Sequence, residues 1–390
     1  MSLPLLEGDR RERVHALARE LHADPELAFE EHRSAQRVAA LLEAEGFAVE
    51  RGVGELPTAL RASRGSGSLV AALCVEYDAL PGIGHGCGHH LIAGASVGAA
   101  LLLADALAAD PSLDLTVQVI GTPAEEHGGG KQLLIERGVF AGVHLALMTH
   151  PTPHTDTYDP VGSTSQAVGR WRATYTGRGA HAAANPSEGV NANDAAVIAQ
   201  VAAGLLRQRV KDGRRLALVP QQSGVTNIIP ATAVVDLECR APDLEEFHAL
   251  HESLLDCLRA GALATGCALE VEALEPLYEP LRQDDLLGGL WNEAMVERGR
   301  PLAGSTGVMA ASTDMGNVSQ HVPSLHPFVG ITGVDAALHT AGFAAQSAGA
   351  EGYRLLDDAA AAMAHVVRRV AADGDLRSQV LARAQELAAR

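Results

Sequence analysis

The chain has 390 residues, 47% of them hydrophobic and 20% charged, which is typical of a globular protein of about two domains. Its 48 acidic residues outnumber its 30 basic residues, and the formal net charge of −18 predicts neither a nucleic acid nor an anionic membrane as a partner. The five cysteines are too few for a disulfide framework, and the N-terminal stretch is charged and lacks a long apolar core. We therefore expect a cytoplasmic protein.

Helical and strand patterns alternate through the first part of the chain. Helices are expected at 9–22, 33–45 and 91–109, and strands at 68–80, 113–123 and 143–151. The segment 91–109 is apolar but rich in alanine and glycine, and we interpret it as a buried helix rather than a membrane span. This alternation predicts an α/β layer with a mainly parallel sheet.

The pattern changes at about residue 168. Strands are expected at RWRATYTG, QQSGVTNII, AVVDLECRA and ALEVEALEP, and two helices complete the order βαββαβ. That order is typical of a ferredoxin-like unit large enough to be a small domain. The sequence thus predicts a catalytic domain in two pieces, 1–167 and 279–390, with a compact domain of residues 168–278 inserted between them.

The sequence DALPGIGHGCGHHLIAG, residues 78–94, is the first candidate for chemistry. Cys87 and His89 are two residues apart, so in an extended segment their side chains point to the same side. Thiolate and imidazole are common zinc ligands, and the glycines allow the backbone to bend around an ion. The loop alone leaves two alternatives open: a glycine-rich turn with solvated histidines, or a nucleophilic Cys87 with a histidine base.

Three further motifs place metal-binding side chains near predicted strand ends. Glu125 and Glu126 follow one strand, His150 ends the next, and His339 lies in a polar turn after an apolar strand. Each of these is unremarkable alone, since paired acids and turn histidines are usually solvated. Together they suggest a metal site in which one acid binds the metal and the other accepts a proton from water. The potential ligands are Cys87, His89, Glu126, His150 and His339, enough for two metals that share a bridging group.

The inserted domain adds three polar residues. His181 lies in the glycine-rich sequence GRGAHAAANP and is suited to donate to a developing oxyanion, and the alternative is a turn histidine at a domain surface. Asn227 and Arg240 end apolar strands. Arginine binds carboxylates with two hydrogen bonds, and the alternative for Arg240 is a structural ion pair.

Six motifs in chain order resemble those of a known family: EYDALPGIGHGCGHHLIAGASVGAA, GTPAEEHGGGK, MTHP, GRGAHAAANP, NIIP and STDMGNVSQHVP. They resemble the aminoacylase/dipeptidase superfamily of cocatalytic metallopeptidases, in the branch of aminobenzoyl-glutamate hydrolase, indoleacetyl-amino-acid hydrolases and β-alanyl-lysine dipeptidase-like proteins. The resemblance implies a zinc-peptidase-like α/β domain with a mixed sheet and an inserted ferredoxin-like lid domain that forms a homodimer.

The resemblance also implies roles for individual residues. Two divalent metals, zinc or else manganese, cobalt or nickel, would be bound by the five ligands named above. Glu125 would be the general base, and Asp78 would orient the metal centre. His181 would supply the oxyanion contact, in this family often across a dimer interface. Asn227 and Arg240 would hold the carboxylate end of the substrate.

The expected reaction is hydrolysis of an amide bond in a dipeptide or an N-acyl or N-aroyl amino acid that carries a free carboxylate. One residue departs from the branch: His90 stands where aspartate or asparagine is usual. A third imidazole there can alter metal preference or pH dependence, or can itself bind the metal. Two other classes stay open, a thiol hydrolase that uses Cys87 and a catalytically inactive binding protein on the same fold.

Overall fold

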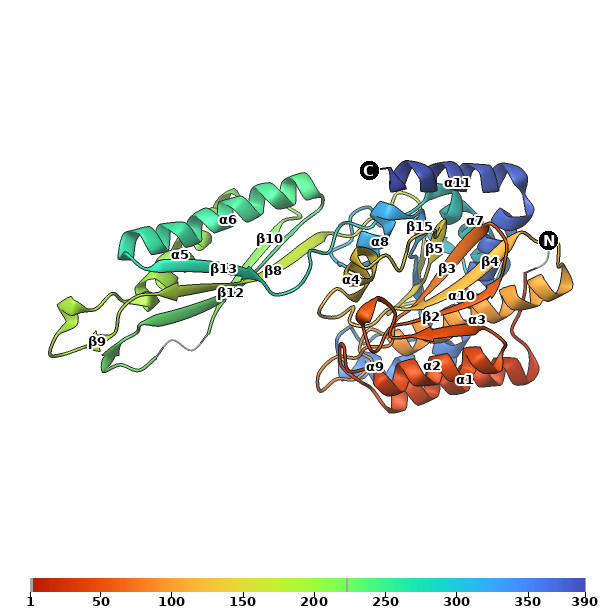
Figure 1. Ribbon diagram of the computed structural model, residues 1–390, viewed down its shortest axis with the longest axis horizontal. Coiled ribbons are helices and arrows are strands. Elements are labelled where there is room, and N and C mark those ends of the chain that lie inside the picture. The colour runs from red at the N-terminus through yellow and green to blue at the C-terminus, as the bar shows by residue number, and fades with distance from the viewer. Residues whose placement is uncertain (1–2, 222–223, 390) are drawn as a thin grey trace. The chain divides into compact units, whose positions relative to one another are not determined.

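The computed structural model describes residues 3–221 and 224–389. The chain forms two compact units: the first comprises Met1–Thr164, Leu281–Met309 and Thr313–Arg390, and the second comprises Ser165–Pro280 and Ala310–Ser312. The short segment Ala310–Ser312, which follows the inserted domain in the sequence, thus packs with the second unit. Figure 1 shows the elements of each unit.

The first unit is built on a mixed six-stranded sheet with the strand order β1-β2-β4-β3-β5-β15. The strands β3, β4, β5 and β15 run parallel, whereas β1 and β2 form an antiparallel edge. In sheet order their bounds are Ala48–Arg51, Leu60–Gly65, Leu115–Gly121, Leu69–Val75, Leu145–Leu147 and Ser324–Leu325. The mixed sheet is the one that the family resemblance predicted.

Helices cover both faces of this sheet because its central strand is apolar on both sides. In β3, Leu69, Ala71 and Leu73 belong to a core formed with α1, α2, α3, α7 and α10, whereas Ala72 and Cys74 belong to a second core formed with α4 and α8. The bounds of these helices are Gly8–Ala23, His32–Ala44, His89–Ala109, Asp285–Glu297, Ala350–Ala372, Gly130–Glu136 and Met315–His321. Two further helices, α9 and α11, span Ala341–Ser347 and Gly374–Ala388.

Helix α3 is long and apolar enough to cross a membrane by length and composition, but 78% of its most apolar window is buried. Its packing against α10 and α1 in the core accounts for its apolar character on all sides. A smaller sheet of the same unit has the order β14-β7-β16-β6. Its strands span Leu302–Ala303, Thr157–Tyr158, Phe328–Gly330 and His150–Thr152.

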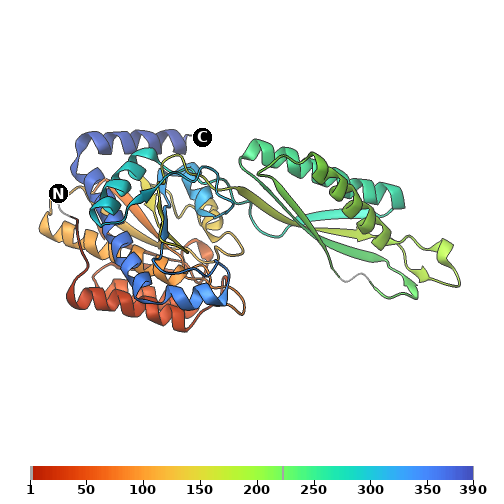
Figure 2. The same cartoon turned by 180° about the vertical axis from the view of Figure 1, so that it is seen from behind.

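The second unit has the predicted order βαββαβ, with an antiparallel sheet in the order β10-β12-β8-β13. Figure 2 shows its two helices, α5 and α6, lying together on the sheet. In chain order β8, α5, β10, β12, α6 and β13 span Ala167–Thr176, Ala192–Leu206, Arg215–Pro220, Thr232–Ala241, Leu244–Thr265 and Ala268–Ala273. The ferredoxin-like topology is confirmed.

One predicted strand of this unit is wrong. The second strand of the sheet is Arg215–Pro220 and not QQSGVTNII, of which residues 222–223 lie outside the described residues. Gly224 has a φ of +113°, a conformation that interrupts an extended strand. Only Ile228–Ile229 of the expected segment is a strand, β11, and it pairs with the short β9 at Ala180–His181.

Candidate metal centre

The parallel strands β3, β4 and β5 end at the same edge of the main sheet, and the loops after them carry most of the predicted site residues. The loop after β3 turns sharply at Gly88, the residue before α3, which has a φ of 75°. A side chain at this position would place its Cβ only 2.6 Å from Cγ of Pro151. Glycine is therefore required between Cys87 and His89, both of which are buried at the start of α3.

His89 is oriented by Asp78. Nδ1 of His89 lies 2.9 Å from Oδ1 of Asp78 and 2.9 Å from its backbone carbonyl oxygen, so Nδ1 carries the proton and donates it there. The other oxygen of Asp78 accepts a hydrogen bond from the backbone N–H of Glu126 at 2.9 Å. Burial alone would raise the pKa of Asp78, but its interactions with His89 lower the pKa below the usual value. This carboxylate thus joins the loops that follow β3 and β4.

The other ring nitrogen of His89 faces carboxylates. Nε2 lies 3.6 Å from Oε2 of Glu76, and 3.9 Å from one oxygen each of Glu125 and Glu126. It is buried and, among the residues that the structure describes, has no hydrogen-bond partner. Burial tends to lower the pKa of His89, but the charge of Asp78 raises it well above the usual value. A buried ring nitrogen that faces several carboxylates is therefore in a place that favours a positive charge, either a proton or a bound cation.

All five predicted ligands come together in the first unit. Cys87, His89 and His150 offer ligand atoms within 4.8 Å of one another, and so do Cys87, Glu126 and His339. Cys87 belongs to both groups. Thiolate, imidazole and carboxylate are the donors that zinc-like ions prefer, so the residues present fit a pair of divalent cations with a shared thiolate.

His150 and His339 are held by backbone contacts. Nδ1 of His150 donates to the carbonyl oxygen of Pro151 at 2.7 Å, and burial lowers the pKa of His150 to about 3, so Nε2 keeps its lone pair. His339 has a φ of 62°, which is uncommon for a residue with a side chain, and its N–H donates to the carbonyl of Gly86 at 2.9 Å. Nε2 of His339 lies 3.7 Å from Oε2 of Glu126. Strained conformations of this kind concentrate at functional sites.

The turn that carries Glu125 and Glu126 is held by a buried acid. Ala124 has a φ of 61°, and its N–H donates to Oε1 of Glu31 at 2.9 Å. Burial and the charge of Asp78 raise the pKa of Glu31 to about 7. Burial, followed by the charges of Glu76 and Glu126, raises the pKa of Glu125 well above its usual value. Glu125 is therefore a stronger proton acceptor than an exposed carboxylate.

Cys87 has the opposite properties to those of a nucleophilic cysteine. Its side chain is buried, and burial raises the pKa of its thiol far above the usual value. A reactive cysteine needs a lowered pKa and access to substrate. The geometry therefore disfavours the thiol hydrolase alternative.

His90 is placed away from the ligands that surround His89. Its ring is fully buried against two other histidines, with centroid distances of 4.8 Å to His22 and 5.3 Å to His85. Burial lowers the pKa of His90 well below its usual value, so its ring is neutral. Among the described residues, His90 belongs to no group with metal-ligand geometry.

The remaining predicted residues lie in the second unit. His181 is exposed in β9, and its Nδ1 accepts hydrogen bonds from the N–H groups of Ala183 and Ala184 at 3.2 and 3.1 Å. The proton of its neutral ring is therefore on Nε2. Asn227 is exposed, and its carbonyl oxygen accepts from the N–H of Ala182 at 3.1 Å.

Arg240 forms the ion pair that was the alternative to a substrate contact. Its guanidinium lies 2.7 and 3.1 Å from the two carboxylate oxygens of Glu238 and donates to Oγ of Ser312 at 3.3 Å. Arg240 and Glu238 both lie in β12, so the pair joins two side chains of the same strand.

Several buried charged residues at the centre were missed by the sequence reasoning. Glu76 lies two residues before Asp78, and Lys131 and Asp314 lie inside the motifs GTPAEEHGGGK and STDMGNVSQHVP. All three are buried, as is Glu31. The sequence does show a charged residue directly after an apolar strand, Glu76, and another after a run of glycines, Lys131. It does not show that these side chains are in contact in the folded protein.

Residues 72–370 match Peptidase family M20/M25/M40, and the chain belongs to this family. It is therefore a metallopeptidase or amidohydrolase of the class that the sequence motifs predicted. Over 372 residues it is 40% identical to the Xaa-Arg dipeptidase of Mus musculus, an alignment that covers 90% of this chain and 84% of the relative.

A more distant relative is a subunit of the p-aminobenzoyl-glutamate hydrolase of Escherichia coli (strain K12), 29% identical over 408 residues, with 86% of this chain and 84% of the relative covered. The fold is similar to that of a dinuclear metal-binding M20 peptidase from Bacillus subtilis. That structure has a TM-score of 0.68 at 22% identity, and the match covers 92% of this chain and 98% of the other.

Proposed function

We propose that this protein is a dipeptidase that uses two divalent metal ions and Glu125 to hydrolyse the peptide bond. The observation that carries this proposal is the pair of ligand groups that share Cys87, because these residues together would hold two cations. The cysteine and histidine ligands favour zinc, with manganese, cobalt and nickel as alternatives.

When bound, the metal pair supplies a Lewis acid for the substrate carbonyl and lowers the pKa of a water molecule. The residues of the chain then move the proton. Glu125 accepts a proton from the attacking water and returns it to the leaving amine, for which its raised pKa is suited. Asp78 keeps His89 in the tautomer whose Nε2 faces the centre.

We propose a dipeptide with a cationic C-terminal residue as the substrate. The Xaa-Arg dipeptidases of mouse and human are 40% and 38% identical to this chain. A net charge of −18 attracts a cationic side chain and repels purely anionic acylamino acids. N-Acyl and N-aroyl amino acids are the second class of substrate, supported by the relative that is named for p-aminobenzoyl-glutamate.

The exposed polar residues of the second unit are proposed to bind the substrate. His181 carries its proton on Nε2 and is suited to donate to the oxyanion that forms on the substrate carbonyl. Asn227 and Arg240 are proposed to hold the substrate carboxylate. The guanidinium of Arg240 would then hydrogen-bond to the carboxylates of Glu238 and of the substrate at the same time.

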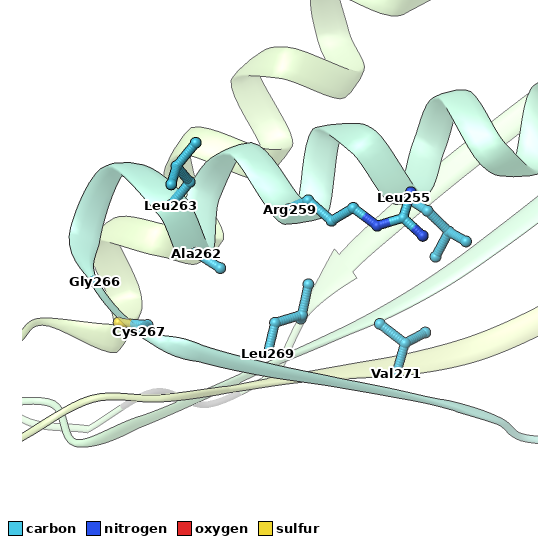
Figure 3. A pocket seen from close by; sticks show the side chains of 8 residues that line it. All are labelled: Leu255, Arg259, Ala262, Leu263, Gly266, Cys267, Leu269 and Val271. Carbon is cyan, nitrogen blue, oxygen red and sulfur yellow. The ribbon is translucent and has the colours of Figure 1, made fainter.

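We further propose that the protein is a homodimer through the second unit. On α5 the side chains of Val197, Val201 and Leu205 are 48%, 58% and 67% exposed, and their spacing of four residues places them on one helix face. A hollow of about 630 Å³ lies between α6 and β13, where Leu263 is 88% exposed (Figure 3). Exposed apolar side chains of this number indicate a protein interface.

A charge on this apolar face tests the dimer. Val201→Glu is expected to produce a monomer in sedimentation velocity experiments, because a carboxylate cannot be buried there without a partner. Glu252→Gln, a change at another exposed position of the same unit, should leave the mass unchanged. A monomeric unmodified protein would contradict the proposal. We also propose a cytoplasmic location, consistent with five free cysteines.

The general base is tested by Glu125→Gln. We expect kcat for an Xaa-Arg dipeptide to fall by about 10²–10⁴-fold while the metal content stays at two ions per chain, because the amide cannot accept the proton. Metal is measured by elemental analysis alongside turnover. The matched control is Glu136→Gln, the same change at an exposed residue of α4. Wild-type turnover in Glu125→Gln would rule out the assigned base.

A substrate panel tests specificity separately. Dipeptides that differ only in their C-terminal residue (arginine, lysine, alanine or glutamate) should be hydrolysed with kcat/KM values that fall in that order. N-Acetyl-arginine and p-aminobenzoyl-glutamate are assayed beside them. Preference for p-aminobenzoyl-glutamate would contradict the proposed substrate while leaving the proposed chemistry intact.

A further inference from the structure

A buried cluster of three charged side chains lies directly beside the candidate metal centre. Nζ of Lys131, in the first turn of α4, pairs with Oε1 of Glu76 and with Oδ1 of Asp314, the latter at 2.6 Å. The second oxygen of Asp314 accepts a hydrogen bond from the backbone N–H of Lys131 at 2.8 Å. None of the three side chains is exposed to solvent. The cluster ties α4 and α8 to the end of β3.

Burial of this cluster costs more free energy than packing alone explains. Two carboxylates and one ammonium leave a formal buried charge of −1, and removing such groups from water costs several kcal/mol per ion. Burial tends to lower the pKa of Lys131, but Asp314 and Glu76 raise it above its usual value, so the lysine stays charged. Apolar residues of similar size would commonly serve packing at least as well. A net negative charge is useful if a cation binds nearby.

The second oxygen of Glu76 faces the metal centre. Oε2 of Glu76 is buried and has no hydrogen-bond partner within 3–221 and 224–389. It lies 3.6 Å from Nε2 of His89, the ring nitrogen that faces the carboxylates. Glu76, His89 and Glu125 also offer ligand atoms that lie within 4.8 Å of one another. One oxygen of Glu76 is therefore held by Lys131 while the other is presented to a proposed ligand and to the proposed base.

We propose that Glu76 is a further positioning residue of the hydrolytic centre, and that Lys131 and Asp314 hold it in the orientation that keeps His89 and Glu125 in place. The assignment rests on the proposed function for the roles of His89 and Glu125. Glu76 adds a buried negative charge beside the ligands and thereby favours a bound cation. In the described chain, Lys131 pairs with Glu76 and Asp314 and with none of the five candidate ligands, so it acts on the centre through these carboxylates.

The proposal is tested first by metal affinity, which needs no substrate. Glu76→Gln keeps the size of the side chain but removes its charge. We expect its affinity for Zn²⁺ to fall by about 10–100-fold in competition with a chromogenic chelator, because residues that support metal ligands have effects of this size. Lys131→Met should also weaken Zn²⁺ binding, although it makes the cluster more negative, because Glu76 is no longer held toward His89. The double variant should lose little more than either single variant, since the residues act as one unit.

A buried ion pair elsewhere in the first unit is the control. Nε of Arg300 lies 2.7 Å from Oδ2 of Asp358, and both residues are buried. The guanidinium of Arg300 also donates to the carbonyl oxygen of Gly330. Neither Arg300 nor Asp358 is a predicted site residue. Arg300→Met should lower the melting temperature, although Asp358 keeps its pair with Arg298 at 2.6 Å, and it should leave Zn²⁺ affinity and turnover unchanged. A general loss of stability is thereby separated from a change at the metal centre.

Turnover gives the second measurement. For the zinc-loaded Glu76→Gln variant, kcat should fall by about 10–100-fold while KM changes less than about threefold, because Glu76 is proposed to position reacting groups and not the substrate. Wild-type Zn²⁺ affinity and kcat in this variant would overturn the proposal, even if Lys131→Met fails to fold. If the unmodified protein hydrolyses no amide substrate, the proposed function fails, and the affinity measurement still decides the role of Glu76.

Discussion

The predicted site residues of the two units differ in how they are held. In the first unit Asp78, His89 and Glu125 are buried, and Asp78 and His89 are oriented by each other and by backbone groups. In the second unit His181 and Asn227 are exposed, and Arg240 is paired with a carboxylate of its own sheet. The candidate ligands are therefore complete within one unit, whereas the residues proposed to bind substrate all belong to the other.

This difference follows from the chemistry required of each region. A cation site needs several like-charged donors close together, and their mutual repulsion demands a rigid and buried framework. Substrate-binding groups must exchange with water as substrate enters and leaves, and they are commonly found on mobile surface elements. Five substitutions distinguish the two regions, taken from the largest expected effect to the smallest.

His181→Ala tests whether an exposed residue of the second unit takes part in the reaction. We expect kcat to fall by about 10²–10³-fold, the usual cost of losing one donor to an oxyanion. Because His181 is exposed, the melting temperature and the metal content should stay the same. Steady-state kinetics and elemental analysis measure these effects. A decrease below about threefold would remove His181 from the mechanism.

Glu31→Gln tests the stability cost of the buried framework. The pKa of Glu31 is raised from 4.5 to about 7 in the folded protein, so the folded state holds a proton that the unfolded chain releases. The free energy of unfolding should therefore decrease as pH rises from about 4.5 to about 7, by roughly 3 kcal/mol in all. The variant lacks this titration and should gain stability relative to the wild type at pH 8 but not at pH 4.5. Urea unfolding at the two pH values measures the difference; parallel curves would contradict it.

Asp78→Asn tests the orientation of a metal ligand. The amide can still contact Nδ1 of His89, but it has no negative charge to favour the correct tautomer. We expect Zn²⁺ affinity or kcat to fall by about 10–100-fold. Chelator competition and turnover are measured on the same preparation. Unchanged values of both would show that His89 is oriented by the backbone carbonyl alone.

Arg240→Ala tests the proposed carboxylate contact against the observed ion pair. If Arg240 binds substrate, KM for an Xaa-Arg dipeptide should rise by about tenfold, the value of one charged hydrogen bond. The matched variant Arg172→Ala removes another arginine–carboxylate pair on the same sheet, with Asp236, and should leave KM unchanged. Equal effects of the two variants would assign Arg240 to the structure of the second unit.

His90→Asn is expected to have the smallest effect. The ring is buried among His22 and His85 and belongs to no group of described residues with metal-ligand geometry. The variant should keep two metal ions and a kcat within about threefold of the wild type. A lower melting temperature is expected, because the shorter side chain leaves a cavity. Loss of one metal ion would place His90 among the ligands.

Much of the centre could be predicted because its ligands lie in short motifs at the ends of strands. Cys87, His89, Glu126, His150 and His339 were each recognisable as potential ligands, and the order of motifs pointed to the family. The strand at 221–229 was predicted wrongly because alternation of side chains does not reveal a left-handed glycine such as Gly224. The cluster of Glu76, Lys131 and Asp314 was missed because Lys131 is 55 and 183 residues away from its two partners.

The class of the protein, its βαββαβ unit and the candidate ligands could be predicted from the sequence, because they depend on residue type and local spacing. Folding was needed to show that Cys87 belongs to both ligand groups, that His90 lies apart from them, and that Glu76 presents an oxygen to His89. The physical reason is distance. Electrostatic interactions and ligand geometry act over a few ångströms, and folding brings together residues that the sequence separates.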